Sequence, residues 1–131
     1  MKNARQDQNY FDMTEPQRAV YHANERKECA KAALNANTIV AELNRTISRR
    51  ESAIMADVCA EQNGDGKPVY SNDAARKAER DRRIESDAVI VAAREELEKK
   101  QLLAQEASID AAYHTDMLRI YCAFAQSTEV A

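Results

Sequence analysis

The residues with the most potential for chemistry form a dense basic group just after the middle of the chain. Its members are Arg76, Lys77, Arg80, Arg82 and Arg83. Guanidinium and ammonium groups at this spacing are suited to contact successive phosphates of a nucleic-acid backbone. Glu79 and Asp81 are interspersed among them, so salt bridges on a solvated helix surface are the alternative interpretation.

Further basic residues join this group if the two halves of the chain fold back on each other. Arg45, Arg49 and Arg50 then come close to it, and Lys67 precedes it in the sequence. Tyr70 at its edge is a candidate base-stacking side chain. We call the candidate nucleic-acid-binding residues the basic zone, which consists of Arg49, Arg50, Lys67, Arg76, Lys77, Arg80, Arg82 and Arg83.

The two histidines do not form a recognisable metal motif. A carboxylate-bridged di-iron bundle needs Glu-x-x-His pairs. Ala19 and Ala111 stand three residues before His22 and His114, where the glutamates would be required. Asp110 lies one helical turn from His114, a spacing that an ordinary solvated contact explains.

The stretch from Glu61 to Gly66 partly imitates the start of an EF-hand loop. Such a loop begins with Asp and has a bidentate Glu at its twelfth position. Here the first position is Glu61 and the twelfth is Asn72, so the match fails at both ends. Phosphate-binding loops, Cys-x-x-Cys pairs and nucleophile elbows are absent from the sequence. We therefore expect no catalytic residue, no metal and no cofactor, and we do not expect an enzyme.

Glycine and proline divide the chain into two helical patterns. The sequence has only two residues of each kind, and Gly64, Gly66 and Pro68 fall close together. These residues cost a helix interior roughly 1 and 3 kcal/mol relative to alanine, so little else interrupts either pattern. Thr14 with Gln17 forms a capping box at the first helix start, and Ser71 or Asn72 caps the second.

The predicted fold is all-α, with two long antiparallel helices forming a coiled-coil-like, oligomeric hairpin. We expect a flexible N-terminal arm over 1–13, a single hairpin over 14–126 and a tail over 127–131. Within the hairpin a helix covers 14–61, a turn 62–71 and a second helix 72–126. Asn-Gly and Asp-Gly steps in the turn supply positive φ.

The second helix carries two apolar lines, which make its face too wide for one partner helix. The first line is Ile84, Ala88, Val91, Leu102, Ile109, Tyr113, Met117, Ile120 and Phe124. The second is Ile90, Ala93, Leu97, Ala104, Ala107, Ala111, Leu118 and Cys122. We expect one line to meet the first helix and the other a neighbouring subunit; the alternative is one broad face covered by the N-terminal segment. The candidate oligomer interface is Ile90, Leu97, Ala104, Ala111 and Leu118.

Composition favours a surface-rich helical protein over an enzyme with a deep pocket. Charged residues make up 31% of the 131 residues and aromatic residues 5%, without tryptophan,. The net charge of −3 is uneven, because residues 44–83 are mildly basic and residues 84–131 acidic. An odd number of widely separated cysteines is typical of free thiols in a reducing compartment. No long apolar run or signal-peptide core is present, so we expect a cytoplasmic protein without membrane partners.

The turn reads Gly66-Lys67-Pro68-Val69-Tyr70-Ser71-Asn72, and the following helix start reads Ala75-Arg76-Lys77-Ala78-Glu79. These two segments resemble those of small helical proteins encoded by bacteriophages and prophages. Genes of that group often lie near genes for single-strand binding and recombination proteins. More loosely, size and layout resemble the recombination mediator proteins of T-even phages, which are helical oligomers that handle single-stranded DNA.

Two functions follow as hypotheses. The resemblance implies a non-enzymatic oligomeric accessory of phage DNA metabolism in the host cytoplasm, with single-stranded nucleic acid or a phage recombination protein as partner. The acidic C-terminal half departs from a strongly basic binder. The alternative is a protein-interaction or structural module that does not bind nucleic acid.

Overall fold

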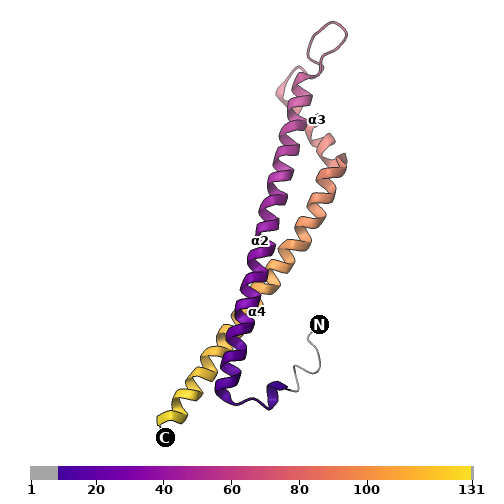
Figure 1. The fold of residues 1–131 in the computed structure, drawn as a ribbon. Helices are drawn as coiled ribbons and strands as arrows, with labels where there is room; N and C mark the ends of the chain where they lie inside the picture. Colours follow the sequence, from indigo (N-terminus) through magenta and orange to yellow (C-terminus); the bar gives the residue numbers. More distant parts are fainter. Residues whose placement is uncertain (1–8, 131) are drawn as a thin grey trace. The chain divides into compact units, whose positions relative to one another are not determined.

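The structure, a computed structural model, describes residues 9–130 and is helical throughout this range apart from its connections (Figure 1). Helix α2 covers Glu15–Ala60, α3 covers Asp73–Ser86 and α4 covers Ala88–Val130. The all-α class is confirmed, and α2 packs against α4. Residues 1–8 of the predicted arm and Ala131 of the predicted tail lie outside the described residues. None of the helices described is long and apolar enough to cross a membrane.

Helix α2 begins with the predicted capping box. The Thr14 backbone N–H donates to the Gln17 side-chain oxygen at 2.9 Å, and the Gln17 backbone N–H donates to the Thr14 hydroxyl at 3.3 Å. These two bonds satisfy amides that the first helical turn leaves without partners. The segment before the helix is held as well, because the Arg18 guanidinium donates to the carbonyl oxygens of Tyr10 and Phe11.

The turn between α2 and α3 is ordered by one asparagine and one glycine. The Asn63 side-chain oxygen accepts hydrogen bonds from the backbone N–H groups of Asp65 and Lys67, and Gln62 forms an isolated β-bridge with Pro68. Gly66 has φ of +75°, which favours glycine,. Gly64 does not share this conformation, so only one of the two Gly steps supplies positive φ.

The second helical region differs from the prediction of one helix over 72–126. Asn72 caps α3, since its side chain accepts from the Ala75 N–H at 2.8 Å. The helix then ends at Ser86, because Asp87 adopts an extended conformation with ψ of 116°. The Asp87 carboxylate accepts from the Ile90 N–H at 3.1 Å, which caps the start of α4,. One residue therefore ends α3 and begins α4.

Two compact units make up the chain, and each is described by itself. The second unit, residues 36–102, is built around Ile54 and Val58 from α2, Ile84 from α3 and Ile90 from α4. In an uninterrupted helix, Ile84 and Ile90 would point about 120° apart. The break at Asp87 turns both towards the same cluster, in which Ile90 is fully buried.

The first unit comprises residues up to 35 together with residues from 103 onwards. Its interior is partly polar, because His22 from α2 and His114 from α4 are both buried, with Ala19 and Ala104 among the buried apolar residues. Tyr10, from the helical turn that precedes α2, donates a hydrogen bond to the Tyr121 hydroxyl of α4 at 2.9 Å. Residues 9–11 are therefore tied to α4 by this side chain.

Candidate functional site

All eight residues of the basic zone lie in the second unit, on α2, in the turn and on α3. Five of them have a carboxylate partner. The ion pairs are Arg50 with Asp87, Arg76 with Asp73, Arg80 with Asp81, Arg82 with Glu79, and Arg83 with both Glu79 and Glu61. Within the described residues, Arg49, Lys67 and Lys77 lack such a partner.

Glu79 is the centre of this network. Its carboxylate accepts from the Arg82 Nε at 2.9 Å and from the Arg83 Nε at 2.8 Å. These hydrogen bonds, first from Arg82 and then from Arg83, lower the pKa of Glu79 from 4.5 to about 2. The same carboxylate raises the pKa of Arg82 and, together with Glu61, that of Arg83. Their charges are therefore balanced within the protein.

Arg50 binds Asp87, the residue at the junction of α3 and α4. Its Nε and one terminal nitrogen both donate to a single Asp87 oxygen, at 3.0 and 2.8 Å. The Asp87 side chain is only 11% exposed. Hydrogen bonds from Arg50 and from the Ile90 backbone lower the pKa of Asp87, which keeps this cap charged. Arg50 thus positions the helix break.

Tyr70, the candidate base-stacking side chain, already has partners on the protein. Its ring is half-buried against the cluster around Ile90, and the Arg83 guanidinium lies 6.0 Å from the ring centroid. Its carbonyl oxygen accepts from the Arg76 Nε at 3.2 Å. Packing of this kind leaves less of the ring available for stacking on a base.

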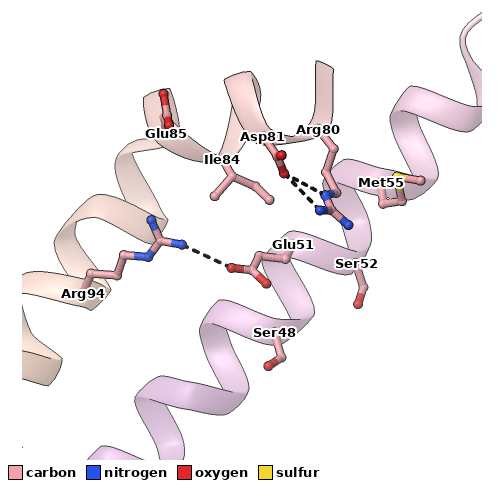
Figure 2. Close-up of a pocket in the computed structure, with 9 residues that line it drawn as sticks. All are labelled: Ser48, Glu51, Ser52, Met55, Arg80, Asp81, Ile84, Glu85 and Arg94. Carbon is pink, nitrogen blue, oxygen red and sulfur yellow. Dashed lines mark hydrogen bonds and ion pairs between the residues drawn. The ribbon is translucent and has the colours of Figure 1, made fainter. Parts of the chain in front are cut away.

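A cleft in the second unit lies where α2 faces α3 and the start of α4 (Figure 2). Its volume is about 690 Å³, and four of its charged lining residues form ion pairs, Arg94 with Glu51 at 3.3 Å and Arg80 with Asp81. The remaining lining residues are Ser48, Ser52, Met55, Ile84 and Glu85. The paired charges suit a shallow polar surface better than a site for one ionic ligand.

Two of the five residues predicted to form an oligomer interface are buried within the chain itself. Ile90 is fully buried and Ala104 is 7% exposed within the chain, so neither is available to a second copy. Leu97, Ala111 and Leu118 are half-buried on the same line. The sequence pattern alone did not show which of the two apolar lines packs against α2. In the structure, the line with the smaller side chains packs inward.

The large apolar side chains of the other line remain exposed in the first unit. Their exposed fractions are 61% for Ile109, 52% for Tyr113, 45% for Ile120 and 52% for Phe124. Steps of four, seven and four residues keep all four on one face of α4. We call these four residues the outer line of α4. Large apolar side chains exposed along one helix face suit an interaction site.

Sequence reasoning missed the buried cluster that His22 and His114 form. Their Nδ1 atoms are 2.8 Å apart, and the Tyr10 hydroxyl lies 3.0 Å from the His22 Nε2. The sequence suggested a metal motif or a solvated contact for the histidines, and neither describes a buried pair. If the two halves of the chain pair antiparallel, as assumed when Arg50 was placed near the basic group, His22 and His114 also lie within one helical turn of each other. Their proximity could therefore have been predicted from the sequence.

Comparisons of the chain with models of protein families, with curated proteins and with solved structures found no match. The resemblance to phage-encoded proteins therefore stays a prediction that rests on residues 66–79 alone.

Proposed function

We propose that this protein is a non-enzymatic helical interaction module that binds a second copy of itself through the outer line of α4. The observation that carries the proposal is the half-exposure of four large apolar side chains on one helix face. Burying on the order of 100 Å² of apolar surface on each side chain contributes about 2.5 kcal/mol per side chain to the free energy of binding, before the cost of association.

The scaffold in this proposal is an antiparallel hairpin. Within the first unit, His22 of α2 contacts His114 of α4, and Tyr10, which precedes α2, contacts Tyr121. Within the second unit, Glu51 binds Arg94 and Glu61, just after α2, binds Arg83. In each unit, residues further along the first helical segment therefore contact residues that come earlier in the second, as an antiparallel hairpin requires.

The spacing of the outer line supports a second copy as the partner. A two-fold interface requires that residue i contacts residue j while j contacts i. The outer line meets this condition when two α4 helices run antiparallel, because Ile109 then lies opposite Phe124 and Tyr113 opposite Ile120. All four side chains would find apolar partners in one arrangement.

Light scattering across the micromolar range tests the proposal. We expect an oligomeric mass for the natural chain and a monomeric mass for Ile109→Asp, because an aspartate on the outer line places charge in the interface. Ser108→Asp is the matched control, since Ser108 is the neighbouring exposed residue outside the line. Circular dichroism of both variants checks that the helices remain. A monomeric natural chain, or equal effects of the two variants, contradicts the proposal.

The nucleic-acid hypothesis has a narrower basis, namely Arg49, Lys67 and Lys77 without carboxylate partners. Residues 61–85 contain equal numbers of acidic and basic side chains, so they provide little net attraction for phosphate,. Adding a short single-stranded oligonucleotide at low salt to the same measurement separates the two functions. Salt-dependent binding that Lys67→Ala and Lys77→Ala weaken would favour the nucleic-acid hypothesis.

A further inference from the structure

The first unit contains a chain of hydrogen-bonding groups, buried at its two histidines, that crosses from α4 to α2 and back. His22 is 1% exposed and His114 is 2% exposed, and their Nδ1 atoms are 2.8 Å apart. The chain continues from the His22 Nε2 to the Tyr10 hydroxyl at 3.0 Å and from there to the Tyr121 hydroxyl at 2.9 Å.

The positions of the protons follow from the donors available. Tyr10 has one hydroxyl proton and donates it to Tyr121, so its oxygen accepts from a protonated His22 Nε2. The Nδ1 of a neutral His22 is then an acceptor, and His114 donates its Nδ1 proton to it. Every member of the chain has a partner in this arrangement.

Protonation of both histidines is incompatible with their contact. When both rings are cationic, each Nδ1 carries a proton, and an N–H from each ring would meet across 2.8 Å. Two cations and two opposed donors in a buried site are strongly unfavourable. The contact therefore holds one shared proton and excludes the state in which both rings are cationic.

The surroundings of the pair also disfavour the state in which both rings are cationic. The His22 ring stacks on Tyr121 and meets the edges of Tyr10, Tyr21 and Tyr113. The Arg18 guanidinium lies 5.1 Å from the Tyr10 ring centroid and 5.7 Å from that of Tyr121, so a cation is already present. The charged residues one helical turn away along α2 and α4 are Arg18 itself, Glu25, Arg26 and Asp110.

We propose that the His22–His114 pair is an acid-sensitive latch of the first unit, independent of the proposed self-association. The latch is closed while the pair shares one proton between its Nδ1 atoms. It opens when both rings become cationic, and opening separates α2 from α4 in this unit and releases Tyr10. The second unit contains no histidine, so its contacts do not respond to this step.

The sign of the pH dependence follows from proton binding. The open state binds protons with the ordinary imidazole pKa of about 6.5, whereas the closed state excludes at least one of them. Opening is therefore favoured as the pH falls below about 6.5 and suppressed above it. Each extra proton bound on opening raises the opening constant about tenfold per pH unit.

Amide hydrogen exchange on the natural chain between pH 7 and 5.5 tests the latch, after correction for intrinsic exchange rates. We expect the opening constant of residues 18–25 and 111–118 to rise by about tenfold to a hundredfold per pH unit in the lower part of this range. Residues 50–58 and 84–93 serve as the internal control and should change little. Equal pH dependence in both groups, or none in either, overturns the proposal.

Nitrogen-15 NMR of the imidazoles provides a second measurement that requires no variant, because the chain has only two histidines. At pH 7.5 we expect His22 with its proton on Nε2 and His114 with its proton on Nδ1. Two rings that titrate independently while the first unit stays closed would refute the latch. The double variant Glu25→Gln with Asp110→Asn should keep the pH dependence of exchange; its loss would assign that dependence to the carboxylates and also refute the latch.

Discussion

Replacing Ile90 with alanine is expected to destabilise the second unit by about 3–4 kcal/mol. The side chain has no exposed surface and packs with Ile54, Val58 and Ile84. The substitution removes three carbons, which cost about 2.4 kcal/mol in transfer free energy at about 0.8 kcal/mol each. The cavity left among these neighbours adds to this cost and brings it into the range of about 2–5 kcal/mol observed for such changes.

Val91→Ala is the matched control for this prediction. Val91 is the next residue of α4, is also β-branched, and is 41% exposed. Its truncation should cost less than about 1 kcal/mol, because part of the side chain is already in water. Urea unfolding monitored by circular dichroism at 222 nm, a wavelength that reports helix content, gives both values from the shift in midpoint at constant slope.

The same measurement on Ile84→Ala tests the helix break. Ile84 is 8% exposed, so its truncation should also cost about 2–4 kcal/mol,. If α3 and α4 formed one uninterrupted helix, the two isoleucines would point about 120° apart and only one could face α2. Large costs at both positions are therefore specific to the break at Asp87. A cost at either position as small as that of Val91→Ala would refute the packing of both isoleucines against α2.

Two further predictions concern the charged residues. Asp87→Ala should lower the thermal unfolding temperature more than Asp87→Asn, because asparagine keeps the cap on the Ile90 N–H and loses only the charge opposite Arg50; equal losses would contradict a capping role. The lowered pKa of Glu79, about 2 against an ordinary 4.5, predicts a stabilisation that is complete above about pH 4.5 and lost as the pH falls towards 2,. The unfolding free energies of the natural chain and Glu79→Gln should accordingly converge between pH 5 and 2.5, and parallel curves would count against the network.

Local rules of helix ends were sufficient to predict several boundaries. Thr14 with Gln17 forms the capping box, and Asn72 caps α3 through its side chain. Gly66 supplies the positive φ of the turn. Each of these features depends on residues within a few positions of one another, so the sequence window that encodes them is short.

The break at Asp87 was missed because helical periodicity continues across it. Ser86 and Asp87 are residues that favour a helix N-cap, and this pair is the signal that could have located the start of α4,. Intrinsic helix propensity does not decide between a cap and an exposed aspartate within a helix. The ion pair with Arg50, thirty-seven residues away, favours the cap, and such a distant contact is not visible in local sequence.

The choice between the two lines of α4 depends on side-chain size as well as polarity. In the first unit, the inward positions include Ala104, which is buried, and Ala111, which is half-buried. Small side chains let two helices approach closely but bury little area per residue. The larger Ile109 and Ile120 would bury more if they faced inward, yet they are 61% and 45% exposed. Outward-facing Ile109 and Ile120 do not stabilise an isolated chain, whereas self-association through the outer line would bury both lines. We therefore propose self-association at the line with the larger residues.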